Sequence, residues 1–80
     1  MLNIQSILFN SNKYNIGDVN KWFKNNNISY ISIFPIVNTT TTDKEYLWRC
    51  RIYNPNKKYF DYTRVIINDD ISFMIQTPKE

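Results

Sequence analysis

The chain has 80 residues, which is enough for one small domain built on a single hydrophobic core. Hydrophobic residues make up 42% of the chain and aromatic residues 16%, a composition typical of a globular protein rather than of a disordered segment. The chain has no histidine and one cysteine, which excludes zinc fingers and triads with an imidazole base. Its net charge of +3 permits an anionic partner without requiring one.

A lone cysteine cannot form the intramolecular disulfide framework on which small secreted domains usually depend. The segment from Met1 to Asn10 carries no basic residue and only a short apolar run, unlike a signal peptide. No run approaches the roughly 20 apolar residues that span a bilayer. We therefore predict an intracellular protein that is not secreted and has no membrane partner.

The first predicted element is a strand over residues 3–9, which is rich in Ile, Leu and Phe and is followed by turn-forming residues. A helix follows, because apolar residues then recur at spacings of three and four. Its predicted buried face consists of Ile16, Val19, Trp22 and Phe23. Asn15 is expected to cap the start of this helix, and the asparagines at 25–27 are expected to end it.

Residues 28–37 are β-branched and aromatic and predict a strand at a sheet edge, because Pro35 has no N–H to donate to a ladder. Residues 38–43 lack periodicity and predict a surface loop. Residues 45–53 alternate most clearly and predict a strand with two distinct faces. We assign Tyr46, Trp48, Cys50 and Ile52 to the core, and Leu47, Arg49, Arg51 and Tyr53 to the opposite face.

Residues 59–67 resume an extended or mixed pattern, with a short helical turn around Tyr59 and Phe60 as the alternative. The turn-forming residues 68–70 lead into a last predicted strand over 71–76. We predict a single domain spanning 1–76, followed by a frayed tail over 77–80. This β-α-β-β-β-β order predicts an α+β fold, in which one helix packs on a small antiparallel sheet of about four to five strands.

The segment Leu47-Trp48-Arg49-Cys50-Arg51-Ile52-Tyr53-Asn54-Pro55 resembles a pattern in small uncharacterised α+β domains of tailed phages and large DNA viruses. In that family an aromatic residue and two alternating arginines precede a proline, and a helix with a Trp-aliphatic pair comes before them, here Trp22-Phe23-Lys24. Where the family usually has a larger aromatic, a Gln and a Gly, this chain has Cys50, Ile52 and Asp70. The resemblance implies a viral or phage protein of the host cytoplasm or the virion, and it implies no catalytic residue.

Arg49 and Arg51 are the central candidate site residues. Because they lie two apart on a strand, their guanidinium groups project from one face about 7 Å apart, which suits phosphates or bidentate carboxylate recognition. The structural alternative is that they pair across strands with an acid such as Asp61, or lie over apolar neighbours with their tips in water. The other candidates for interaction or phosphate binding are Tyr53, Lys57, Lys58 and Arg64.

The remaining reactive residues do not predict chemistry. Asp69 and Asp70 are adjacent and point to different sides, so we interpret them as turn residues and not as a cation site. Cys50 has no nearby base in the sequence, so we interpret it as a buried thiol and not as a nucleophile. We predict no enzymatic activity, no catalytic residue, no metal and no cofactor.

The leading functional prediction is a protein-interaction module, acting as a virion or assembly factor or by self-association, whose Arg49 and Arg51 face engages an acidic protein surface or a second copy. An edge strand within residues 31–37 would offer a route to a homodimer. The first alternative is a nucleic-acid-binding protein that uses the same arginines on phosphates and Tyr53 on bases. The second is an inhibitor of a host defence enzyme.

Overall fold

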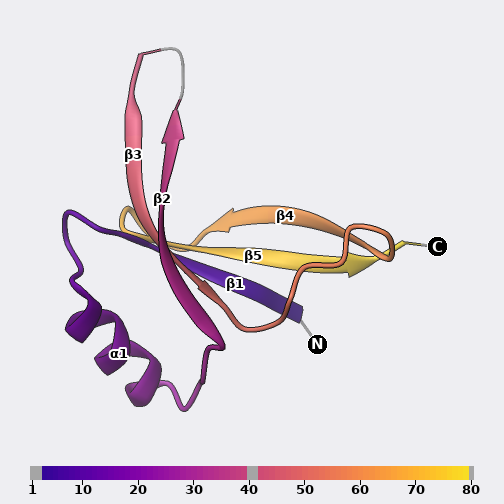
Figure 1. The fold of residues 1–80 in the computed structure, drawn as a ribbon, viewed down its shortest axis with the longest axis horizontal. Helices are drawn as coiled ribbons and strands as arrows, with labels where there is room; N and C mark the ends of the chain where they lie inside the picture. Colours follow the sequence, from indigo (N-terminus) through magenta and orange to yellow (C-terminus); the bar gives the residue numbers. More distant parts are fainter. Residues whose placement is uncertain (1–2, 40–41, 80) are drawn as a thin grey trace.

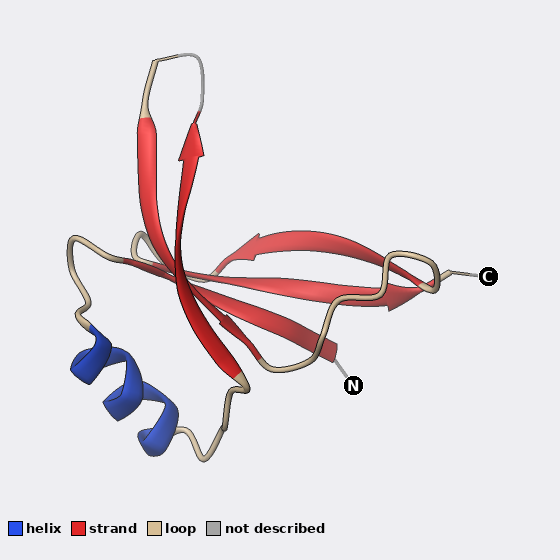
Figure 2. Ribbon diagram, in the orientation of Figure 1, coloured by secondary structure: helices blue, strands red, loops and turns tan. Residues whose placement is uncertain are grey.

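The structure is a computed structural model and describes residues 3–39 and 42–79. Its elements are β1 (Asn3–Asn10), α1 (Ile16–Asn25), β2 (Ser32–Thr39), β3 (Lys44–Arg51), β4 (Phe60–Ile66) and β5 (Ile71–Pro78). The strands form one antiparallel sheet in the order β2-β3-β1-β5-β4, and α1 lies on one side of it (Figure 2). The predicted α+β fold with one helix is confirmed, and most of it is sheet.

The sheet is strongly twisted. Figure 1 shows β2 and β3 running across the direction of β1, β4 and β5. Right-handed twist accumulates from strand to strand, so the face of the sheet opposite α1, called the open face below, curls inward. As a result Arg64 of β4 reaches Glu45 of β3 at 2.9 Å, although β5 and β1 lie between these two strands in the sheet.

The helix begins as predicted. The Asn15 side-chain oxygen accepts a hydrogen bond from the Asp18 N–H at 2.8 Å, and the Asp18 carboxylate accepts one from the Asn15 N–H at 3.1 Å. This reciprocal capping box satisfies two backbone donors at the helix start. The predicted end is confirmed as well, because Asn27 adopts a left-handed conformation with φ of 54°. Ile16 was wrongly assigned to the buried face, since it is 46% exposed in the first turn.

The core lies between α1 and the sheet. Its buried members are Ile7, Phe9, Val19, Phe23, Cys50 and Ile71. The Phe9 ring is fully buried, and its centroid lies 5.4 Å from that of Trp22 and 5.8 Å from that of Phe23. The offset and edge-on arrangement of these rings adds to the stabilisation from their burial. The few aromatic side chains of β1 and α1 therefore account for much of the core.

The predicted core face of β3 is partly right. Trp48, Cys50 and Ile52 pack on the core, and the Trp48 Nε1–H donates to the Tyr14 carbonyl at 2.9 Å. Tyr46 was wrongly assigned, since it is 44% exposed, while Leu47 on the other face is buried. The inward curl of the open face explains this reversal, because it creates a second apolar region around Leu47 and Leu8.

Several boundaries differ from those predicted. β2 begins at Ser32 and not at residue 28, and it extends into the expected loop 38–43, of which residues 40 and 41 lie outside the described residues. β3 ends at Arg51, because the next two N–H groups turn to the Gln5 carbonyl at a bulge of β1. Strand β4 covers residues 60–66 of the expected segment 59–67. The alternative of a turn around Tyr59 and Phe60 is partly right, because residues 57–59 form a turn in which the N–H groups of Tyr59 and Phe60 donate to the Asn56 carbonyl.

β5 continues two residues beyond the expected end of the domain. Thr77 and Pro78 pair with Asp61 and Phe60 of β4, and the Lys79 N–H donates to the Tyr59 carbonyl at 2.8 Å. Residues 77–79 therefore belong to the folded unit and are not a frayed tail, because β4 supplies pairing partners that the local sequence does not reveal. Glu80 lies outside the described residues.

Cys50 is buried, as predicted, and burial raises the pKa of its thiol from 9.0 to about 12. The unfolded chain therefore loses this proton above pH 9 while the folded chain keeps it, and stability is lost as the pH rises through this window. We expect the free energy of unfolding to fall by about 1.4 kcal/mol per pH unit more steeply in the wild type than in Cys50→Ala. Urea unfolding below and above pH 9.0 measures this, and parallel pH profiles would contradict it.

Candidate anion-binding site

Arg49 and Arg51 both lie on the open face, as the alternation in β3 predicted. Arg49 is flanked by Leu8 of β1 and Phe34 of β2. Arg51 is flanked by serines in these two strands, and its guanidinium carbon lies 4.8 Å from the centroid of the Phe34 ring. Both arginines therefore lie on a strand with a neighbour on each side, and part of each side chain is shielded from water.

Neither arginine is neutralised by an acid of the described residues. Among residues 3–39 and 42–79, no carboxylate forms an ion pair with either guanidinium, and the suggested acid Asp61 lies 3.8 Å from the Lys79 ammonium instead. The Nε atoms of Arg49 and Arg51 are buried and have no hydrogen-bond partner in this part of the chain. Arg49 Nη2 donates to a neutral acceptor, the Gln5 Oε1, at 3.5 Å. Pairing of these arginines with Asp61 was therefore a wrong expectation.

The electrostatics of Arg49 indicate a local shortage of negative charge. Burial, and then the nearby Arg51 guanidinium, lower the pKa of Arg49. A guanidinium nevertheless keeps its proton in proteins, so the charge stays and its desolvation is a cost to the fold. An anion placed beside Arg49 would offset both the burial and the repulsion.

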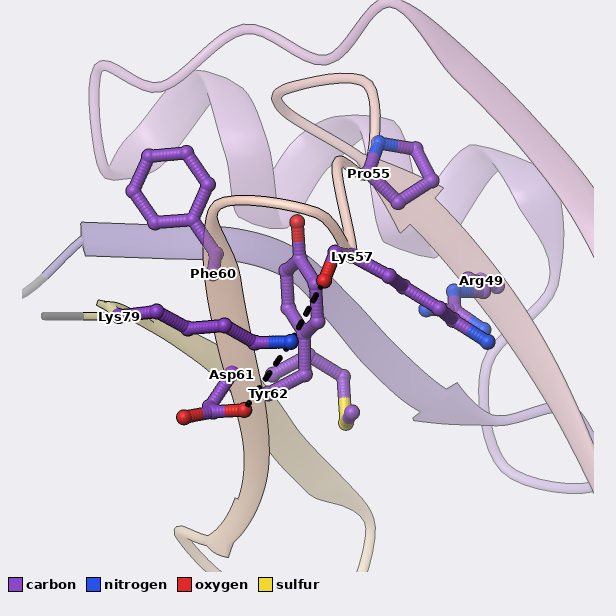
Figure 3. A pocket seen from close by; sticks show the side chains of 8 residues that line it. Arg49, Pro55, Lys57, Phe60, Asp61, Tyr62 and Lys79 are labelled. Atoms are coloured by element: carbon purple, nitrogen blue, oxygen red, sulfur yellow. Dashed lines mark hydrogen bonds and ion pairs between the residues drawn. The ribbon is translucent and has the colours of Figure 1, made fainter.

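A pocket with a volume of about 450 Å³ opens beside Arg49. It is lined by Arg49, Pro55, Lys57, Phe60, Asp61, Tyr62, Met74 and Lys79, and it is called the cationic pocket below. These residues come from β3, β4, β5, the loop between β3 and β4, and the residue after β5. Figure 3 shows the Lys57 side chain extending toward Arg49. Three cationic side chains thus surround the pocket together with a single carboxylate.

The loop that forms one wall of the cationic pocket is held at several points. The Gln5 Nε2 donates to the Tyr53 carbonyl at 2.7 Å, and the Asn56 N–H donates to the Tyr62 hydroxyl at 2.6 Å. The Lys79 ammonium donates to the Lys57 carbonyl at 2.8 Å. These contacts fix the wall before any ligand arrives, which lowers the entropy that binding would cost.

The structure brings only some of the predicted site residues together. Arg49 and Lys57 share the cationic pocket, and Arg51 stands next to Arg49 on the same face. Tyr53 is exposed and outside the pocket lining, and the Lys58 ammonium lies 5.3 Å from the centroid of the Tyr59 ring.

Arg64 is engaged elsewhere. It makes two hydrogen bonds to the Glu45 carboxylate, at 2.9 and 3.0 Å, and its Nε donates to the Ser72 hydroxyl at 2.9 Å. The hydrogen bond from Arg64 lowers the pKa of Glu45, although partial burial opposes this. This side chain therefore closes the other end of the open face and does not add to the cationic pocket.

Lys79 and Gln5 are among the residues that shape the site and that the sequence did not predict. Lys79 was placed in a frayed tail, although a β-branched Thr77 just before it was a signal that β5 continues. Gln5 is fully buried, and nothing in its sequence context distinguishes it from an exposed strand residue. Its position at the bulge of β1 depends on pairing with both neighbouring strands.

The fold and the pocket together define a small α+β protein with a pocket on its open face in which three cationic side chains outnumber one carboxylate. Comparison of the chain with protein-family models, curated proteins and solved structures finds no significant match. The resemblance to phage and viral domains therefore stays a prediction. Within the described residues, no helix has the length and hydropathy to cross a membrane, and no group of three or more acidic or cysteine side chains is placed to hold a metal.

Proposed function

We propose that the chain is a non-enzymatic interaction module that binds an acidic segment of a partner protein, with a carboxylate seated against Arg49 in the cationic pocket. The observation that carries this proposal is the Arg49 side chain, which lines the pocket and whose buried Nε has no hydrogen-bond partner among the described residues. Native proteins rarely leave such donors unused, and those that remain commonly meet a ligand or water.

The composition of the pocket supports a carboxylate carried on a peptide. A guanidinium can bind both oxygens of a carboxylate, and the Lys57 ammonium adds positive charge to the pocket, while the Lys79 ammonium is shared with Asp61. The Tyr62 hydroxyl accepts from Asn56, which leaves its own proton able to donate to a ligand. Apolar walls from Pro55, Phe60 and Met74 would contact the methylene groups of a glutamate or aspartate.

The distribution of charge favours this partner over nucleic acid. A strand of nucleic acid requires a positive groove that follows the backbone over several phosphates. Here Glu45 neutralises Arg64 at one end of the open face, while Arg51 and Lys58 each stand over an aromatic ring of the chain itself. On the open face, three cationic side chains instead meet in one pocket. Inhibition of a host defence enzyme stays a prediction, and it would be one consequence of binding an acidic surface.

The test compares two probes on the same protein. A labelled peptide rich in Glu and Asp is titrated by fluorescence anisotropy beside a single-stranded oligonucleotide of equal charge. We expect the peptide to bind more tightly, and we expect Arg49→Gln to weaken it about tenfold or more, since a charged hydrogen bond contributes about 1.5–3 kcal/mol. Lys58→Gln is the matched control, because it removes one positive charge outside the pocket.

Amide chemical shifts locate the binding. Peptide-induced shifts are expected at residues that line the cationic pocket and not on α1. Equal losses of peptide affinity for Arg49→Gln and Lys58→Gln would show that only net charge matters, and would refute the cationic pocket as the binding site. A preference for the oligonucleotide would replace this proposal with the nucleic-acid alternative, and a lack of binding to either probe at low salt would reject both.

A further inference from the structure

The described sheet has two outer strands, β2 and β4. A free edge invites another strand unless proline, lysine or a bulge protects it. β2 carries Pro35, which has no N–H to offer a further strand. β4 contains neither proline nor lysine, and its pairing with β5 runs without a bulge from Phe60 to Ile66. Residues 31–37 are the self-association edge expected from the sequence, whereas the outer strand without proline or lysine is β4.

The hydrogen bonds between β4 and β5 show which backbone groups of β4 point away from the sheet. The Ile67 N–H donates to the Ile71 carbonyl at 3.0 Å, and the Tyr59 carbonyl accepts from the Lys79 N–H at 2.8 Å. In an antiparallel pair such bonded positions alternate, so the odd-numbered residues of β4 face β5. Tyr62, Arg64 and Ile66 therefore direct their N–H and C=O groups away from the sheet, whereas the Phe60 N–H already donates to the Asn56 carbonyl.

The side chains along this edge are unusually apolar for an exposed strand. Val65 is 42% exposed, Ile66 70% and Ile67 50%, at one end of β4. At the other end stand Tyr59, which is 56% exposed, and the half-buried Phe60. Aromatic and β-branched side chains stabilise each other when they lie opposite across two strands. The two ends of this edge are therefore complementary to each other.

We propose that two copies of the chain pair through β4, antiparallel, about a twofold axis at Thr63. This register opposes Ile66 with Phe60 and Tyr62 with Arg64 of the second copy, and it uses the whole of β4, whose central residue is Thr63. The alternative axis at Arg64 would set two like charges against each other, and an axis at Tyr62 would place Ile66 opposite Lys58. A second copy of the chain therefore pairs with the β4 edge, in the register that has its axis at Thr63.

This dimer does not depend on the proposed function, but it would change how strongly the cationic pockets bind a partner. A twofold axis through an antiparallel pair stands perpendicular to the sheet, so both open faces lie on the same side of one continuous sheet. The two cationic pockets, each lined partly by β4, would face the same way. A partner with two acidic segments would then gain avidity from the pair.

A disulfide tests the register directly. Thr63 would face its own copy at a non-hydrogen-bonded position, with Cα atoms about 4.5 Å apart, which a disulfide can bridge. In Asp61→Cys the two sulfurs would be offset by about 14 Å along the strands, beyond the reach of a disulfide. We expect Thr63→Cys to form a covalent dimer under mild oxidation on non-reducing gels, and Asp61→Cys and the wild type, with its buried Cys50, not to do so.

Sedimentation velocity over about two decades of concentration tests the association without a covalent trap. We expect a dimer for the wild type and a shift to monomer for Ile66→Lys, which puts a charge on the apolar edge. Val37→Lys is the matched control on β2, since Val37 is 55% exposed, and it should leave the dimer intact. A wild type that is monomeric throughout, a dimer lost only in Val37→Lys, or equal crosslinking of both cysteine variants would overturn the proposal.

Discussion

Phe9→Ala is expected to lower the free energy of unfolding by about 3–5 kcal/mol, which is a large part of the total stability of so small a domain. Phe9 is fully buried, and its ring touches the rings of Tyr14, Trp22 and Phe23 with centroids 5.3–5.8 Å away. Removing it opens a cavity between β1 and α1 that these large rings cannot fill without leaving their own packing. A domain of this length is stabilised by only about 4–12 kcal/mol.

Urea unfolding monitored by tryptophan fluorescence measures this loss, because Trp22 and Trp48 pack on the same core. Tyr59→Ala is the control, since Tyr59 is an aromatic residue that is 56% exposed, and its loss is expected to cost less than about 1 kcal/mol. Equal midpoints for the two variants would show that the aromatic cluster of β1 and α1 is not the centre of the core.

Gln5→Ala is expected to have the second largest effect and to lower both the stability of the fold and the affinity for the acidic peptide. Gln5 is fully buried, donates to the Tyr53 carbonyl at 2.7 Å, and accepts a hydrogen bond from Arg49 at 3.5 Å. Alanine would leave a cavity and a carbonyl without its donor, and together these are expected to cost about 2–4 kcal/mol. The loop wall of the cationic pocket would also lose the contact that ties it to β1.

Both consequences can be measured on one protein sample. Urea unfolding gives the loss of stability, and anisotropy with the acidic peptide gives the loss of affinity at temperatures where the variant is still folded. Gln76→Ala is the control, because Gln76 is a glutamine on neighbouring β5 that is only partly buried. If Gln5→Ala matches this control in stability and keeps full affinity, the bulge of β1 does not organise the pocket.

Arg64 shows how twist can remove a residue from a site predicted from the sequence. It belongs to the same basic middle region as Arg49, and no local signal separates them. In the folded chain Arg64 meets Glu45 of β3, a contact that exists only because the sheet curls across β1 and β5. Arg49 meets no such acid among the described residues, and so the proposed site is built around it.

The elements themselves could be predicted from the sequence because their signals are local. The spacing of Val19, Trp22 and Phe23 and the capping by Asn15 determine α1 within a few turns of chain. The alternation in β3 places Arg49 and Arg51 on one face whatever the neighbouring strands are, because side chains of a strand alternate between its two sides.

Strand order, curvature and the assembly of the pocket were decided only by the tertiary structure. They depend on pairing between segments far apart in the sequence, such as β1 with β5, and on twist that accumulates over the whole sheet. Such pairing buried Gln5, brought Lys79 beside Lys57 and left β4 as the unprotected edge. A residue's own neighbours carry no information about these long-range contacts, and so the sequence alone could identify the two arginines but not the pocket that surrounds Arg49.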